Sequence, residues 1–216
     1  MAQGLPVSKP LFINQLSRKM KTPFRLQASE YDCVPTTALN ALSYLYERNE
    51  IPPLAIQRVF MYCLDSVSSR QNLGHGTTSY AVQLFGNWLN EFRKNKFQTN
   101  ATYITGSDVN LSQNNKIART LNSGGAALIR IKTSGKSWHY ILGLTLDESW
   151  LYAFDPHPGR NSKNSYDKYE FIKPKTGQSP NLRIRRDWIG IKSSKSPYRF
   201  GNESDREALL LERATT

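Results

Sequence analysis

The chain has 216 residues, of which 29 are lysine or arginine and 17 are aspartate or glutamate, so its formal net charge is +12. This length suits one domain with its own hydrophobic core, and no run approaches the roughly 18 apolar residues that a membrane-spanning helix needs. The first residues lack the apolar stretch of a secretory signal, and two cysteines are too few for a disulfide framework. We therefore expect a cytoplasmic protein without membrane insertion.

The positive charge suggests an anionic partner, such as nucleic acid, anionic lipid or an acidic peptide. The basic residues form only modest clusters, at Arg18-Lys19-Lys21, Arg93-Lys94-Lys96 and Arg183-Arg185-Arg186. No base-stacking motif of RNA-binding domains accompanies them. This pattern favours a solvated basic surface that aids solubility, with nucleic-acid binding as the weaker alternative.

The first half of the chain has the pattern of helices. Residues 1–24 are polar, basic and interrupted by prolines, so we expect an irregular N-terminal arm. Apolar residues then recur at helical spacing from Cys33 to Arg48, and again over residues 53–64 and 78–92. Proline is tolerated in the first turn of a helix, so Cys33 is expected at the N-terminus of the first one.

The second half has the pattern of strands. Short apolar runs separated by turns rich in glycine, serine and aspartate predict strands at 101–105, 126–132, 138–146 and 150–154, with a helix at 114–121 and a further strand near 182–191. Residues 201–216 are expected to be a polar, helix-prone tail. Residues 25–200 are thus expected to form one α+β domain, in which an N-terminal helical half packs against a C-terminal antiparallel sheet across a cleft.

Three residues could together form a thiol-nucleophile site. A helix N-terminus and a nearby imidazolium both lower the pKa of a thiol, and Cys33 is expected at such an N-terminus. His139 lies in a predicted strand, where its ring could serve as the base. The next strand ends at Asp155, and a hairpin between the two strands brings this carboxylate level with His139. Gln27 could donate its side-chain amide to an oxyanion, together with the Cys33 backbone amide.

Each of these residues also has an ordinary structural interpretation. Cys33 could be a small buried hydrophobic residue, His139 a core histidine, and Asp155 a turn former before a proline. Their order and spacing together favour the site over these separate explanations.

Three other side chains are also reactive by type. Two of them are expected outside the site, and the third is a weaker candidate for the catalytic base. Cys63 has no polar neighbours at helical spacing and is expected to pack in the core. His75 is expected in a flexible loop. His157 competes with His139 as the base, but Asp155 is too near to it along the chain to support its ring well.

The order of these residues resembles a known family. The segment Gln27-Ala28-Ser29-Glu30-Tyr31-Asp32-Cys33, the strand Trp138-His139-Tyr140 and the pair Asp155-Pro156 resemble the bacteriocin-processing peptidases of family C39 and their papain-like relatives. The resemblance covers residues 25–160 and implies a papain-like fold that needs no cofactor and no metal ion. One departure is Val34, because these bacterial peptidases usually have glycine after the nucleophile.

The resemblance also implies roles for the residues. Cys33 would attack a peptide carbonyl, His139 would act as base and then as acid, Asp155 would orient His139, and Gln27 would line the oxyanion hole. Members of the family often remove leader peptides after a Gly-Gly pair, so the expected partner is a peptide or protein substrate. The chain has no Walker motif, which indicates an enzyme without an attached transporter.

Two other functions fit the same residues. An amidase, deamidase or acyltransferase would use the same acyl-enzyme with another acceptor. A catalytically inactive C39-like binding module would instead hold an acidic peptide or nucleic acid on the basic surface.

Overall fold

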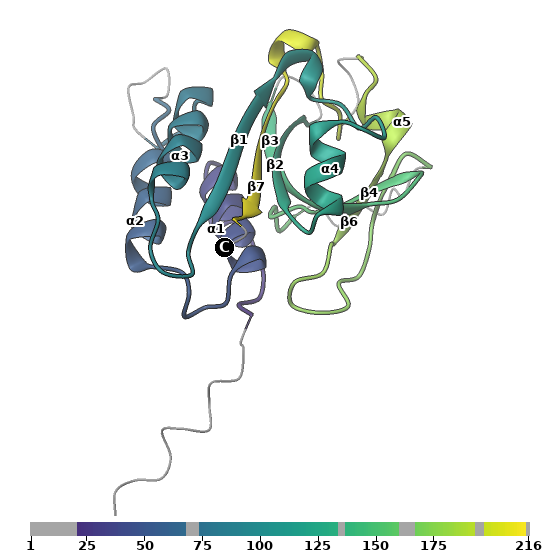
Figure 1. Ribbon diagram of the computed structural model, residues 1–216. Coiled ribbons are helices and arrows are strands. Elements are labelled where there is room, and N and C mark those ends of the chain that lie inside the picture. Colours follow the sequence, from purple (N-terminus) through teal and green to yellow (C-terminus); the bar gives the residue numbers. More distant parts are fainter. Residues whose placement is uncertain (1–20, 68–73, 134–136, 160–166, 193–196, 215–216) are drawn as a thin grey trace, which may run out of the picture.

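The computed structural model describes residues 21–67, 74–133, 137–159, 167–192 and 197–214. Three helices, α1 (Cys33–Leu45), α2 (Pro53–Tyr62) and α3 (Ser79–Glu91), precede a seven-stranded antiparallel sheet (Figure 1). This order confirms the predicted α+β class. The predicted arm up to residue 20 and most of the predicted loop around His75 lie outside the described residues.

The sheet has the strand order β1-β7-β2-β3-β4-β6-β5. Three central strands, β2 (Ala126–Lys132), β3 (Trp138–Leu146) and β4 (Trp150–Phe154), have the bounds that the sequence predicts. The other strands are β1 (Thr99–Thr105), β5 (Tyr169–Phe171), β6 (Leu182–Arg185) and β7 (Glu207–Arg213). The described residues also form two short α-helices, α4 (Lys116–Asn122) and α5 (Arg186–Ile189), and two 3₁₀ helices, Gly106–Asp108 and Glu203–Asp205. The predicted strand near 182–191 therefore ends early and continues as α5.

Both faces of the sheet are buried. Helices α1, α2 and α3 cover one face, where Leu128 and Leu209 belong to their core, and α4 lies on the other face with Ile129 and Leu210 (Figure 1). Adjacent residues of one strand thus enter opposite cores, because side chains alternate along a strand. This arrangement explains why β2 and β7 are nearly continuous apolar runs.

The prediction of a tail over residues 201–216 is wrong. Residues 207–213 form β7, which pairs with β1 on one side and with β2 on the other. The local sequence favours a helix because alanine, leucine and glutamate are good helix formers. Burial of Leu209, Leu210 and Leu211 between two layers outweighs this preference.

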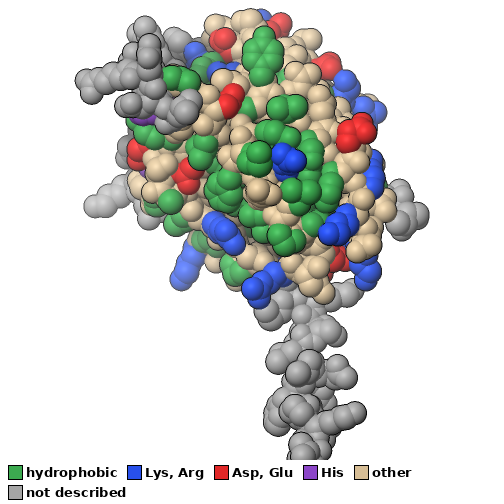
Figure 2. Space-filling view, turned by 90° about the vertical axis from the view of Figure 1, so that its left-hand side faces the viewer, with side chains coloured by type: hydrophobic (Ala, Val, Ile, Leu, Met, Phe, Trp, Pro, Cys, Tyr) green, Lys and Arg blue, Asp and Glu red, His purple; other side chains and the backbone are tan. Residues whose placement is uncertain are grey.

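The outer face of the helical layer exposes large apolar side chains (Figure 2). The most exposed of them are Phe60 and Met61 on α2, at 50% and 57% exposure, and Tyr80 and Leu84 on α3, at 84% and 51%. The sides of α2 and α3 that face the sheet are buried. A substitution at Leu84 is therefore expected to leave the core intact.

Replacing Leu209 with alanine should lower the free energy of unfolding by about 2–5 kcal/mol, because it leaves a cavity between α3 and β7. Leu209 is fully buried, and a Cβ atom built on Gly86 of α3 would lie 2.7 Å from its Cδ1. Urea titration measures the change, with Leu84→Ala as the control that should lose less than about 1 kcal/mol. Equal losses in both variants would contradict the central position of β7.

Candidate active site

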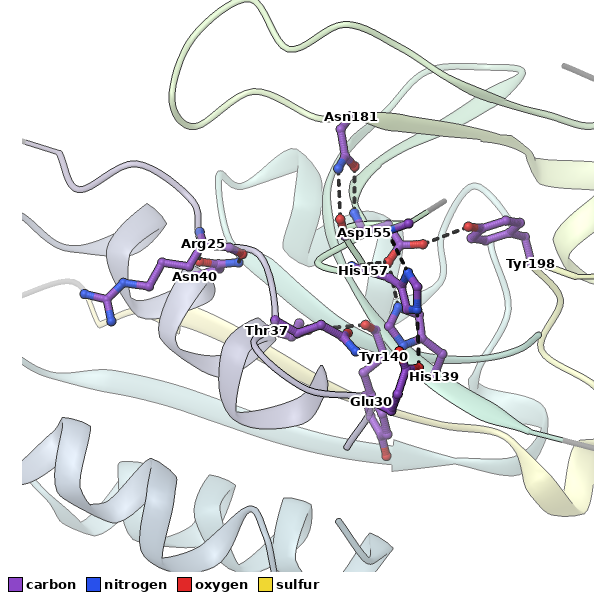
Figure 3. Close-up of polar contacts among 12 residues, drawn as sticks. Arg25, Glu30, Thr37, Asn40, His139, Tyr140, Asp155, His157, Asn181 and Tyr198 are labelled. Atoms are coloured by element: carbon purple, nitrogen blue, oxygen red, sulfur yellow. Dashed lines mark hydrogen bonds and ion pairs between the residues drawn. The ribbon is translucent and has the colours of Figure 1, made fainter. Parts of the chain in front are cut away.

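His139 and Asp155 form a buried hydrogen-bonded pair. His139 is the second residue of β3, and Asp155 follows directly after β4, the antiparallel neighbour of β3. The Nε2 atom of His139 lies 2.7 Å from Oδ1 of Asp155, and the two side chains are only 4% and 0% exposed (Figure 3). The predicted meeting of these two residues across the hairpin is therefore confirmed.

The carboxylate of Asp155 is held by further hydrogen bonds. The Tyr198 hydroxyl donates to its Oδ2 at 2.7 Å, and the His157 backbone amide donates to its Oδ1 at 2.9 Å. Asn181 accepts from the Asp155 amide and donates to the Asp155 carbonyl, at 2.7 and 2.8 Å (Figure 3). These contacts fix the position of the carboxylate before any ligand binds.

The contacts of Asn181 and Tyr198 with Asp155 were not predicted from the sequence. Asn181 comes just before β6, which pairs with β4, and Tyr198 lies in an irregular segment and has a positive φ of 59°. The positive φ is uncommon for a residue other than glycine, asparagine or aspartate. Neither residue belongs to a motif or a periodic pattern that would have identified it.

Cys33 is the first residue of α1 and its side chain is half-buried. The first turn of α1 contacts β3 at Tyr140, the neighbour of His139. The Thr37 hydroxyl donates to the Tyr140 carbonyl at 3.3 Å, and the Tyr140 backbone amide is near enough to the Cys33 thiol to lower its pKa. The structure therefore brings the thiol to the strand residue next to the histidine.

The expected lowering of the Cys33 pKa is wrong. Burial raises the pKa of this thiol above its ordinary value, and the charges of Asp32 and Asp155 act in the same direction. Hydrogen bonds from the backbone amides of Tyr140 and Val34 oppose the shift without cancelling it. The thiol thus remains protonated at neutral pH, and a base must remove its proton before it can act as a nucleophile.

The loop before Cys33 is organised by Asp32. Its carboxylate accepts hydrogen bonds from the amides of Ala28 and Ser29 at 3.0 and 2.7 Å. Partial burial favours the neutral form of Asp32, but these hydrogen bonds outweigh it and lower the pKa of the carboxyl. The carboxylate therefore fixes the turn that leads into α1.

Gln27 is buried beside the residues that follow β4. Its backbone amide donates to the Pro156 carbonyl at 2.8 Å, one residue after Asp155. Its side-chain nitrogen donates to the Ser29 carbonyl at 2.7 Å, while its buried Oε1 has no hydrogen-bond partner among the described residues. Gln27 thus lies at the site, with one amide hydrogen engaged within its own loop.

Val34, the residue after Cys33, packs in the core. It is 2% exposed and belongs to the core that α1 shares with the sheet. The valine side chain is therefore directed into the core and not to the surface.

Tyr140 is anchored from β7. Its hydroxyl donates to Glu207, which also accepts from the Tyr103 hydroxyl at 2.6 Å and lies 3.4 Å from Arg130. Glu207 on β7, Tyr103 on β1 and Arg130 on β2 all lie on the same side of β3 in the sheet. β7, whose residues were predicted to be a tail, therefore helps to hold Tyr140, which contacts α1 through Thr37.

The other reactive side chains have different surroundings. The ring of His157 lies 3.5 Å from Glu30 and accepts a hydrogen bond from the Gly159 amide at 3.1 Å, whereas the ring of His75 packs against Tyr31. Cys63 is fully buried, as predicted, and burial raises its pKa to about 12. Of the two cysteines, only Cys33 is close enough to Asp155 for the charge of this carboxylate to affect its pKa.

Neither a protein-family model nor a curated protein sequence matches this chain. Among the described residues, no group of three or more histidine, cysteine, aspartate or glutamate side chains could hold a metal ion. No helix in the same part of the chain is long and apolar enough to cross a membrane. The chemical assignment therefore depends on the side chains around His139 and Asp155.

Proposed function

We propose that the protein is a cysteine peptidase with a papain-like fold, similar to the C39 peptidases, in which Cys33 is the nucleophile. The observation that carries this proposal is the buried pair of His139 and Asp155, which lies beside the Tyr140 contact between β3 and α1, the helix that begins at Cys33. A thiol, an imidazole and a carboxylate in this order are the groups that nucleophilic acyl transfer requires.

In the proposed mechanism, His139 first removes the proton from the Cys33 thiol. Its Nε2 is engaged by Asp155, so the ring accepts this proton at Nδ1. The thiolate then attacks the substrate carbonyl carbon, and the Cys33 backbone amide and the Gln27 side-chain amide bind the oxyanion. His139 gives the proton to the leaving amine as the C–N bond breaks. A water molecule then attacks the thioester while His139 takes its proton. As the C–S bond breaks, His139 returns this proton to the sulfur, and the acid and the free thiol are released.

Asp155 keeps the ring of His139 in the orientation that this sequence needs. As a carboxylate it accepts the hydrogen on Nε2, which leaves Nδ1 free to accept a proton. The hydrogen bonds from Tyr198 and from the His157 amide hold the two carboxylate oxygens in place, since one group donates to Oδ2 and the other to Oδ1.

Alkylation of the native protein by iodoacetamide tests whether Cys33 is activated. We expect modification of Cys33 alone, because Cys63 is fully buried and its pKa is about 12. The raised pKa of Cys33 predicts a rate that climbs with pH on the alkaline side, and assistance by His139 adds reactivity near neutral pH. Peptide mapping by mass spectrometry at several pH values measures both effects.

The His139→Ala variant is the control for this experiment. It should lose the alkylation of Cys33 near neutral pH. It should keep only the increase in alkylation rate at alkaline pH that a thiol with a raised pKa shows without a base. Equal modification of both cysteines in the native protein, or an unchanged pH profile in His139→Ala, would contradict an activated thiol and favour the binding module.

Synthetic peptides with a central Gly-Gly pair test the reaction itself. Cleavage after this pair that depends on Cys33 would support the peptidase. Selective alkylation of Cys33 without cleavage of any peptide would instead favour an amidase or acyltransferase, which uses the same acyl-enzyme with another acceptor.

A further inference from the structure

A cavity of about 600 Å³ lies beside the Asp155 end of the candidate site. Its walls are the lead-in segment with Phe24 and Leu26, the end of β4 at Phe154, the end of β5 at Phe171, and the connection between β5 and β6 with Ile172. This volume falls within the range of about 300–1,000 Å³ that is typical of ligand pockets. The cavity is therefore large enough for a bulky side chain together with part of a peptide backbone.

The cavity is continuous with the residues that hold the catalytic carboxylate. His157 and Asn181 line it, and each of them hydrogen-bonds to Asp155. Leu26 also lines it and is directly followed by Gln27, the proposed oxyanion donor. A substrate bound at Cys33 would thus have the cavity on the side of His139 and Asp155.

The walls of the cavity are fixed in the absence of a ligand. The Phe24 amide donates to the Gly177 carbonyl at 2.6 Å, and the Phe24 ring packs on Phe154 with 4.9 Å between centroids. The side-chain nitrogen of Gln178 donates to the carbonyls of Thr22 and Ser43, both at 2.7 Å. A pocket held in this way binds a side chain without first paying the entropy of ordering a loop.

The lining is mostly apolar, and none of the residues that form it is acidic. Lys173 is its one lysine or arginine, and His157 is the other basic residue. An apolar side chain would gain from burial here, whereas a second positive charge would be repelled. The lining thus favours an uncharged or acidic segment of substrate that carries one large apolar residue.

We propose that this cavity binds the leaving side of the substrate, namely a large apolar residue within the first few positions after the scissile bond. This inference rests on the proposed function, in which the acyl part is bonded to Cys33 while His139 protonates the leaving amine. The leaving segment therefore lies on the histidine side of the site, as the cavity does. This segment departs before the thioester is hydrolysed. Binding in the cavity therefore raises the rate of acylation and leaves the rate of deacylation unchanged.

The experiment uses peptides that share one acyl part and differ after the Gly-Gly pair. Leucine, alanine, glutamate or lysine is placed in turn at each of the first four leaving positions, and kcat/KM is measured. We expect leucine at one of these positions to exceed alanine by about tenfold or more, and lysine to be the poorest. Single-turnover decay of the common acyl-enzyme should be the same for all of them.

Two variants locate the preference. Ile172→Glu should remove the advantage of leucine, and Lys173→Glu should reverse the order of glutamate and lysine at the neighbouring position. Leu84→Glu, on the outer face of α3, is the matched control and should leave both preferences unchanged. Circular dichroism and the rate of Cys33 alkylation confirm that the variants are folded and that the thiol is unaffected.

Binding to the Cys33→Ala protein separates this inference from the proposed function. Fluorescence anisotropy with the labelled leucine and alanine peptides should show the same preference, and Ile172→Glu should remove it. If no peptide is cleaved but this preference persists, the pocket stands and the peptidase fails. If peptides are cleaved but neither kcat/KM nor binding depends on the leaving residue, or Ile172→Glu leaves the preference intact, the pocket inference is wrong.

Discussion

Replacing Cys33 with alanine is expected to abolish peptide cleavage, with a loss of roughly 10⁴-fold or more in kcat/KM. The sulfur forms the only covalent bond to the substrate in the proposed mechanism, and no other thiol lies beside His139. The free energy of unfolding should change by less than about 1 kcal/mol, because Cys33 is half-buried at the start of α1 and alanine is a good helix former. Mass spectrometry with the Gly-Gly peptide and urea titration measure the two quantities.

The matched control is Cys63→Ala. Cys63 is fully buried just after α2, so alanine leaves a small cavity and should lower the free energy of unfolding without changing kcat/KM. The two variants thus separate a chemical role from a packing role for the same residue type. Cleavage that survives in Cys33→Ala would rule out the thiol as the nucleophile.

Asparagine in place of Asp155 is expected to lower kcat/KM by about 10²–10⁴-fold. The carboxylate can only accept the hydrogen on Nε2 of His139, whereas an amide can donate to Nε2 and place the ring hydrogen on Nδ1 instead. In that tautomer the ring cannot accept the thiol proton. Asparagine has nearly the same size and keeps the backbone contacts with Asn181, so the fold should remain. The pH profile of Cys33 alkylation should then match that of His139→Ala.

Tyr198→Phe is a smaller change at the same carboxylate. It removes the hydrogen bond to Oδ2 and leaves the contact between Oδ1 and His139 in place. A hydrogen bond to a charged group contributes about 1.5–3 kcal/mol, so we expect a loss of about tenfold, well below that of Asp155→Asn. Full activity in both variants would show that His139 works without the carboxylate.

The sheet illustrates which elements local sequence can predict. The bounds of β2, β3 and β4 agree with the predicted ranges, because each strand is a clear apolar run between turn-forming residues. β5 has only three residues and no such pattern, and it was not predicted. β7 has the composition of a helix and becomes a strand because its leucines are buried between two layers.

In the candidate site, too, some contacts can be predicted from local sequence and others cannot. His139 and Asp155 are 16 residues apart on one hairpin, so alternation and turn length were enough to predict that they meet. Asn181 and Tyr198 reach Asp155 from 26 and 43 residues further along the chain. Their contacts depend on how β6 and the segment around Tyr198 fold back, which no local pattern records.

The α+β class, the helix that begins at Cys33 and the hairpin that joins His139 to Asp155 can all be predicted from the amino-acid order, because each follows from short-range periodicity. The place of residues 207–213 inside the sheet, the hydrogen bonds of Tyr198 and Asn181 to Asp155, and the raised pKa of Cys33 emerge only in the folded chain. All three depend on burial, and burial is set by which distant segments cover a residue and not by its neighbours along the chain.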